Sequence, residues 1–354
     1  MQQHREELLA TAKKMCAEGR GILAADESVT TLTAKFDKIG LNCSDENRRA
    51  YRELLITAPE LEQYVSGIIL FQETVEQRTA AGERFVDVLT QRGIVPGIKL
   101  DKGLVPLTPG SKEHFTRGMD DLNERAREFY EKGCRFAKWR CALRNDAEHP
   151  SPLAMRETAY TLARYAAVCQ ANGLVPIVEP ELLSDGSWDI ERGVATSTRV
   201  FAEVFRAMHE YGVAFDACFF KPHMVTGGSE LPRGSAEEIA RRTVDVLRAT
   251  CPPAMAGIFF LSGGQSEKEA TLNLQRIAQY AAEAGRPWHL SFSYGRALQT
   301  TVVDTWRGKA ENVAVAQQAL LQRARHNYNA VLGRYDAQAD THSAESSFQK
   351  DYAY

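Results

Sequence analysis

Eight short apolar segments recur along the chain, and stretches with helical periodicity separate them. Successive segments begin about 30–45 residues apart, which leaves room for one crossover helix between neighbours. They are residues 22–26, 66–71, 95–102, 135–140, 174–181, 217–224, 257–264 and 289–295. This repetition predicts an α/β fold, a (β/α)8 or TIM barrel, in a single domain.

A doubly wound parallel sheet is the competing architecture. Such a fold often carries Gly-x-Gly-x-x-Gly after its first strand, and no such motif follows residues 22–26. Both folds place ligands at the carboxyl ends of parallel strands, so the search for a site is the same in either case. Helical spacing is expected over residues 5–18, 45–57, 117–132, 151–172, 191–211, 235–249, 266–284 and 310–332, with further helical material before residue 92.

The domain is expected to span residues 1–334. Residues 335–354 are polar and poor in apolar side chains, so they are expected to form a flexible C-terminal tail.

Composition excludes several functional classes. The chain has 354 residues and a net charge of -3, which argues against a nucleic-acid partner. No apolar run approaches about 20 residues, and the first residues do not resemble a targeting signal, so no membrane partner is expected. The seven cysteines are scattered and odd in number, which is typical of reduced thiols in a cytoplasmic protein.

Lys221 is the first candidate catalytic residue. It ends a run of apolar, β-favouring residues, and Pro222 stops the strand. Burial lowers the pKa of a lysine and favours the neutral amine, which is the state that attacks a carbonyl. The alternative is a lysine whose stem lies on the core while its ammonium reaches water.

Polar residues end most of the other segments, which favours a shared pocket at the barrel mouth. Side chains two apart on a strand share a face, so Glu179 and Glu181 point the same way, as do Lys138 and Arg140. Asp26 ends the first segment, although it is also suited to capping the turn that follows. Glu181 and Lys138 have alternative roles as structural ion-pair partners.

Two glycine-containing turns indicate phosphate binding. Ser262 and Gly263 lie at the end of the seventh segment, and Gly295 and Arg296 come directly after Ser293 and Tyr294 at the end of the eighth. The loops after these two strands are the usual phosphate site of this barrel, because glycine lets backbone N–H groups approach an anion. The eight histidines form no closely spaced ligand pair, so no metal is expected; a metal site assembled from histidines distant in the sequence is the weaker alternative. No other cofactor is expected.

Seven ordered motifs resemble the class I fructose-bisphosphate aldolases along nearly the whole chain. They are residues 21–28 (GILAADES), 99–103 (KLDKG), 136–140 (FAKWR), 178–181 (VEPE), 221–225 (KPHMV), 261–266 (LSGGQS) and 291–298 (SFSYGRAL). The chain also ends in tyrosine, as members of this family commonly do.

The resemblance implies reversible cleavage of fructose 1,6-bisphosphate to two triose phosphates, in glycolysis and gluconeogenesis, through a Schiff base on Lys221. Glu179 would act as acid and base beside Lys138, Asp26 would take the C4 hydroxyl proton, and Tyr354 on the tail would exchange a proton at C3. Ser262, Gly263, Gly295 and Arg296 would hold the 1-phosphate, and Ser28 and Lys102 the 6-phosphate. Members of the family are commonly homotetramers.

The chain departs from the family pattern at two places. His223 stands where asparagine or serine is common, and residues 29–35 keep only Lys35 of a usual Lys-Arg pair. The second departure concerns the 6-phosphate end of the site. A transaldolase-like Schiff-base enzyme and a phosphosugar-binding scaffold are the alternative functions; paired phosphate signals argue against the first, and the intact acidic and basic residues against the second.

Overall fold

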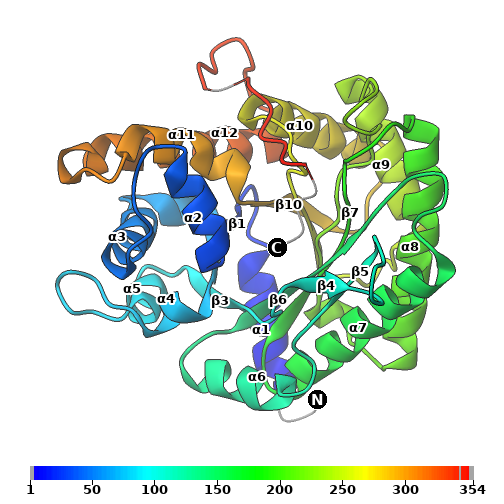
Figure 1. The fold of residues 1–354 in the computed structure, drawn as a ribbon, viewed down its shortest axis with the longest axis horizontal. Helices are drawn as coiled ribbons and strands as arrows, with labels where there is room; N and C mark the ends of the chain where they lie inside the picture. The colour runs from blue at the N-terminus through cyan, green and yellow to red at the C-terminus, as the bar shows by residue number, and fades with distance from the viewer. Residues whose placement is uncertain (1–3, 343, 351–354) are drawn as a thin grey trace.

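Eight parallel strands close into a barrel, which confirms the predicted fold class (Figure 1). The structure, a computed structural model, describes residues 4–342 and 344–350. Pairing of Ile22 with Ser293 joins the first strand to the last and excludes the open doubly wound sheet. Around the barrel the strands are β1 (Gly21–Ala25), β10 (His289–Tyr294), β9 (Gly257–Phe260), β8 (Phe219–Phe220), β7 (Val175–Leu182), β6 (Phe136–Leu143), β3 (Val95–Lys99) and β2 (Val65–Leu70).

Helices form an outer layer around these strands (Figure 1). Many begin at a serine or aspartate whose side chain accepts a backbone N–H of the first turn, a cap that contributes about 1 kcal/mol. Across the described part of the chain, no helix combines the length and apolarity that a membrane span requires. The helices are α1 (Arg5–Met15), α2 (Val29–Asp37), α3 (Asp45–Ile56), α4 (Gln72–Glu76), α5 (Phe85–Gln91), α6 (Leu122–Glu131), α7 (Pro152–Ala171), α8 (Ile190–Glu210), α9 (Ala236–Thr250), α10 (Glu267–Glu283), α11 (Arg296–Trp306) and α12 (Val313–Val331).

Two helices were not anticipated from the sequence, and one begins later than predicted. Both α2 and α11 are rich in threonine and valine, whose branched side chains weaken intrinsic helix propensity. The helix predicted from residue 117 begins at Leu122, because residues His114–Thr116 form β5 of a hairpin with β4 (Leu104–Pro106).

The lower half of the barrel interior is a closed apolar cluster. Phe136, Phe219 and Phe259 point inward from three strands and are fully buried. Helix α1 adds Leu8, Ala12 and Met15 to the same cluster and so closes the amino-terminal end of the barrel. Among the described residues, the barrel is therefore closed at the amino-terminal end and offers a ligand its interior at the carboxyl ends of the strands.

Gly97 provides a test of this packing. A Cβ at this position would lie 2.2 Å from Cζ of Phe136, inside the barrel. We expect Gly97→Ala to lower the free energy of unfolding by about 1–3 kcal/mol through overpacking, measured by denaturant titration. Adding Phe136→Leu should restore part of the loss; an additive further decrease would show that the two side chains do not clash.

Candidate active site

The alternation of strand residues places the predicted polar groups together above the apolar cluster. Lys138 and Arg140 on β6 follow the inward Phe136 at intervals of two, and Glu179 and Glu181 follow Ile177 on β7 in the same way. Lys221 follows β8 directly and donates its backbone N–H to the carbonyl of Val178, so it continues the sheet. All five side chains line one cavity of about 340 Å³.

An ion network joins the centre of this cavity. Glu179 forms an ion pair with each neighbouring ammonium group: Lys221 Nζ lies 3.1 Å from its Oε1, and Lys138 Nζ lies 3.1 Å from its Oε2. Lys138 Nζ also donates to Asp26 Oδ2 at 3.0 Å. All four groups are buried, so two carboxylates and two amines share a space shielded from water.

Burial and neighbouring charge shift the protonation of these groups. Burial lowers the pKa of Lys221; Glu179 opposes this effect, and the adjacent Lys138 lowers the pKa further. Burial alone would raise the pKa of Asp26, but Lys138, Lys99 and Lys221 hold it well below its usual range. The cavity therefore favours an ionised Asp26 and makes the neutral amine of Lys221 more accessible.

A second buried pair lies beside the first. Arg140 Nε donates to Glu181 Oε2 at 2.6 Å, and Arg140 lowers the pKa of Glu181 against the opposing effect of burial. Asp101 Oδ2 accepts the backbone N–H of Arg140 at 3.2 Å, and Lys99 Nζ lies 3.7 Å from Asp101 Oδ1. Lys99 ends β3 and Asp101 follows two residues later, so both continue the inward alternation of that strand and lie buried beside the cavity-lining pair of Arg140 and Glu181.

The expected phosphate-binding groups also line the cavity. Gly263 and Gly264 adopt positive φ angles of 53° and 77°, so the turn after β9 depends on glycine. Arg296 begins α11, where the helix dipole favours an anion. The Ser293 hydroxyl is buried and has no hydrogen-bond partner among the described residues, although Ser293 lines the cavity. Gly295 and Ser262 complete this side.

Residues 345–349 of the tail line the same cavity. Arg296 Nη1 donates to the carbonyl of Ser347 at 2.6 Å, and Ser347 Oγ donates to the carbonyl of Gln265 at 2.6 Å. Ser346 Oγ donates to the carbonyl of Gly264 at 3.1 Å. The tail thus contacts the groups expected to hold a phosphate. Tyr354 lies outside the described residues.

Ser28 and Lys102 are not brought to the cavity. Ser28 caps α2 by accepting the N–H of Thr31, and Lys102 lies half-exposed with its Nζ 2.5 Å from Asp121. Thr31, Lys35 and Lys38 line the cavity instead, and their spacing places them on one face of a helix. Recognising α2 in the sequence would have revealed this face.

His223 does not face the cavity, which explains why this departure from the family pattern is compatible with the site. Its Nδ1 accepts the N–H of Leu182 at 3.3 Å, and its Nε2 lies 2.8 Å from Ser197 Oγ on α8. Burial lowers the pKa of His223 to about 4.

This buried histidine predicts a loss of stability in acid. The unfolded chain, with an imidazole pKa of about 6.5, binds more protons than the folded chain between about pH 6.5 and 4. We expect this group to remove about 2 kcal/mol of stability between pH 7 and pH 5. His223→Asn should flatten that slope in urea titrations, whereas the exposed His209→Asn should leave it unchanged. Equal slopes in all three proteins would contradict the assignment.

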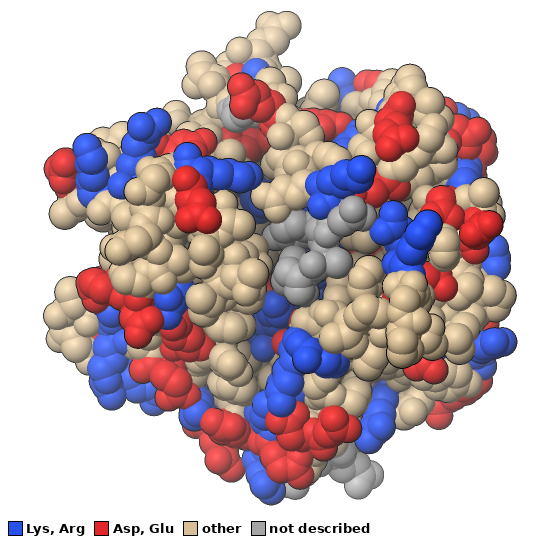
Figure 2. Space-filling view, in the orientation of Figure 1, with Lys and Arg blue, Asp and Glu red and all other residues tan. Residues whose placement is uncertain are grey.

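On the face shown in Figure 2, positive and negative side chains are intermixed, without a broad area of one sign. The concentrated charge is instead inside the barrel mouth. The fold and this cavity define a (β/α)8 enzyme with a buried lysine, flanking carboxylates and an adjoining anion-binding turn.

Comparison with known proteins gives the family. A family model described as "Fructose-bisphosphate aldolase class-I" matches residues 7–354. Fructose-bisphosphate aldolase 1, chloroplastic, of Chlamydomonas reinhardtii is 50% identical over 351 residues, covering 99% of this chain and 92% of the relative. The fructose-bisphosphate aldolase of Dictyostelium discoideum is 49% identical over 354 residues, covering 99% and 98%.

A solved structure agrees. Fructose-bisphosphate aldolase from Plasmodium falciparum, crystallised in complex with TRAP and a small-molecule inhibitor, superposes with a TM-score of 0.91 at 48% identity and covers 94% of this chain and 96% of that one. The chain belongs to the class I fructose-bisphosphate aldolase family, whose members are metal-independent carbon–carbon lyases.

Proposed function

We propose that this chain cleaves fructose 1,6-bisphosphate reversibly to dihydroxyacetone phosphate and glyceraldehyde 3-phosphate, through a Schiff base on Lys221, in glycolysis and gluconeogenesis. The observation that carries the proposal is the buried Lys221 amine, 3.1 Å from Glu179 at the floor of the cavity. A lysine in this setting has a lowered pKa and is poised to attack a ketone.

The first half of the reaction forms the imine. Neutral Lys221 Nζ attacks C2 of the open-chain ketose, and the ketone oxygen becomes the hydroxyl of a carbinolamine. Glu179, in its protonated form, donates a proton to that hydroxyl, and water leaves as the C–N double bond forms. Lys138, 3.1 Å from Glu179, supports the anionic form of the acid between these steps.

The second half breaks the carbon–carbon bond. Asp26 takes the proton of the C4 hydroxyl, the C3–C4 electron pair moves into the protonated imine, and glyceraldehyde 3-phosphate leaves. The resulting enamine is neutral at nitrogen, so the developing carbanion is stabilised without a metal. Tyr354 is proposed to return a proton to C3, after which hydrolysis releases dihydroxyacetone phosphate and regenerates the amine.

Binding groups at both ends of the cavity support a bisphosphate substrate. Ser262, Gly263, Gly295 and Arg296 are proposed to hold the 1-phosphate, with the unpartnered Ser293 hydroxyl available to a substrate oxygen. At the far end, the position of Thr31, Lys35 and Lys38 makes them better candidates for the 6-phosphate than Ser28 or Lys102. Arg140 and Glu181 are proposed to bind the sugar hydroxyls between them.

Borohydride trapping tests the proposal. Incubation with dihydroxyacetone phosphate and borohydride should reduce the imine and attach one triose phosphate to Lys221, located by peptide mass spectrometry. A coupled assay should detect cleavage of the bisphosphate, and a chelator should leave the rate unchanged. Cleavage of the bisphosphate without an adduct at Lys221 would contradict the Schiff-base assignment, but it would still support the proposed cleavage activity.

Assembly and location are further parts of the proposal. The expected homotetramer is supported by the exposed aromatics Phe115, Tyr160 and Tyr211, which line an open hollow of about 840 Å³ with Asp120. Sedimentation velocity tests the tetramer.

A cytoplasmic location is supported by the seven cysteines, all among the described residues and all unpaired. Relatives include both cytosolic and chloroplastic proteins. Residues 335–354 are proposed to act as a tail distinct from the barrel domain, residues 1–334.

A further inference from the structure

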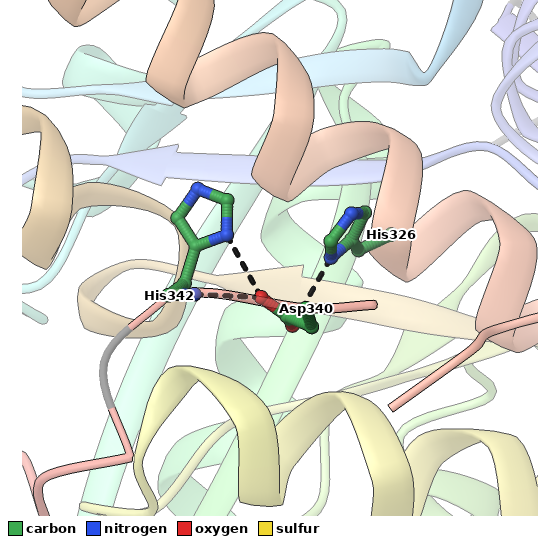
Figure 3. Close-up of side chains that lie close together, drawn as sticks. All are labelled: His326, Asp340 and His342. Carbon is green, nitrogen blue, oxygen red and sulfur yellow. Dashed lines mark hydrogen bonds and ion pairs between the residues drawn. The ribbon is translucent and has the colours of Figure 1, made fainter. Parts of the chain in front are cut away.

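Two histidines and an aspartate converge where the tail leaves the barrel (Figure 3). His326 lies on α12, and Asp340 and His342 lie in the segment that follows this helix. Their two imidazole nitrogens and carboxylate oxygen all lie within 4.8 Å of one another. None of the three residues lines the active-site cavity, so the proposed reaction does not account for them.

Buried neighbours hold the central carboxylate firmly. Asp340 Oδ2 accepts from Arg323 Nη1 at 2.7 Å and from the hydroxyl of Tyr335 at 2.7 Å. Asp340 Oδ1 accepts the backbone N–H of His342 at 2.9 Å. The side chains of Asp340 and Arg323 are both 0% exposed. Metal-ligating carboxylates are typically held by such outer contacts, which fix their direction before an ion binds.

Both imidazoles present the same nitrogen to this carboxylate. Nδ1 of His342 lies 2.8 Å from Asp340 Oδ1, and Nδ1 of His326 lies 3.0 Å from Asp340 Oδ2. The His326 nitrogen is shielded from solvent, yet it makes no well-directed hydrogen bond to any described residue. This arrangement leaves the His326 nitrogen able to turn from the carboxylate toward an ion that both groups share.

We propose that His326, Asp340 and His342 bind a divalent transition-metal ion of the zinc or cobalt type. Two imidazole nitrogens and a carboxylate oxygen are a common protein ligand set for such ions, with water in the remaining position. The His326 side chain is 20% exposed, which gives an ion a route from solvent.

The geometry requires a small adjustment on binding. Two ligands of a tetrahedral ion lie about 3.3 Å apart when each is about 2.0 Å from the metal. The present N–O distances of 2.8 and 3.0 Å are shorter, so the imidazoles must move outward slightly. Arg323 neutralises the single carboxylate, so the ion adds net positive charge and the affinity should be moderate.

The site has a structural consequence for the tail. It links α12 to residue 342, only a few residues before the segment 345–349 that lines the active-site cavity. A bound ion would close the loop between His326 and His342, which contains the exposed Arg334. The metal would thereby restrict the root of the tail without entering the catalytic cavity.

Cobalt titration tests the site directly. Untagged full-length protein, freed of metal by a chelator, should bind one Co²⁺ per chain, with visible absorption bands that Zn²⁺ abolishes. His326→Gln and His342→Gln should each weaken binding by about tenfold or more, and the double variant should lose the signal. The exposed His209→Gln serves as the matched control and should bind as the parent does. Binding should also weaken at acid pH, because protons compete for the ring nitrogens.

A second measurement separates metal binding from its effect on the tail. Zn²⁺ should slow tryptic cleavage after Arg334 in the parent chain and in His209→Gln, but not in the double histidine variant. Absence of saturable Co²⁺ binding, or equal binding by the double variant, would overturn the site. Binding without protection at Arg334 would overturn the restraint on the tail. Melting temperatures of all variants should be compared, so that unfolding is not mistaken for loss of a ligand.

Discussion

Replacing Lys221 by methionine should lower the turnover number for fructose 1,6-bisphosphate by about 10⁵-fold. Methionine has a similar length but no amine, so neither the carbinolamine nor the imine can form. In the proposed mechanism the imine is the electron sink for C3–C4 cleavage. Lys138 also pairs with Glu179, but it contacts the other carboxylate oxygen and Asp26, so it does not occupy the position of Lys221.

The same substitution should leave the fold intact. Lys221 is buried, and replacing a desolvated amine by an apolar side chain of similar volume is often neutral or stabilising. Glu179 keeps its contact with Lys138 at 3.1 Å, so one charge pair remains. The measurements are the coupled cleavage rate, the mass of the borohydride adduct and the melting temperature.

Lys309→Met is the matched control, because Lys309 is exposed and does not line the active-site cavity. It should retain both the rate and the adduct. A Lys221→Met protein that turns over within tenfold of the parent would disprove the role of this amine. In the parent chain, kcat/KM should rise with pH as Lys221 deprotonates, since its lowered pKa brings the neutral amine toward neutral pH.

Replacing Glu179 by glutamine should reduce turnover by about 10²- to 10⁴-fold, which is the usual contribution of a positioned acid or base. Glutamine keeps the shape of the side chain but cannot exchange a proton with the carbinolamine hydroxyl. It also removes the anion that touches both Lys221 and Lys138.

Removing the carboxylate of Glu179 also changes the electrostatics of Lys221, and this effect separates a role in dehydration from a role in activating the amine. Glu179 raises the pKa of Lys221, so its removal should lower that pKa and supply more neutral amine. Nucleophilic attack would then be at least as favourable, while dehydration would be slow. The variant should therefore accumulate less reducible imine, and borohydride trapping should slow in parallel with turnover.

Glu181→Gln provides the comparison. Glu181 pairs with Arg140 rather than with Lys221, so its loss should affect substrate affinity more than imine formation. Equal losses of trapping in the two variants would show that Glu179 has no special part in dehydration. Faster trapping in Glu179→Gln would show that amine deprotonation, rather than dehydration, limits the reaction.

Side chains alternate between the two faces of a strand, and this alternation explains why most of the candidate site could be predicted from the sequence. Glu179 and Glu181, and Lys138 and Arg140, occupy alternate positions on long strands, so a buried barrel interior fixes their direction. Lys99 follows the same rule on β3, but Lys102 lies three residues further on, beyond the strand, and turns outward to Asp121. Residue type alone could not separate these two lysines.

Local sequence determined the number of barrel strands, their inward faces and most helix starts, because apolar periodicity and capping residues act over a few neighbours. It did not indicate the hairpin of β4 and β5. Tertiary structure alone decided the rest. Packing made helices of the threonine- and valine-rich α2 and α11, and so brought Lys35 to the cavity. It also placed Ser347 against Gln265 and gathered His326, Asp340 and His342. Ser347 and Gln265 lie 82 residues apart, and the His326 group depends on how the segment after α12 folds back on that helix, so burial of the barrel and its outer helices supplies the free energy that holds these contacts together.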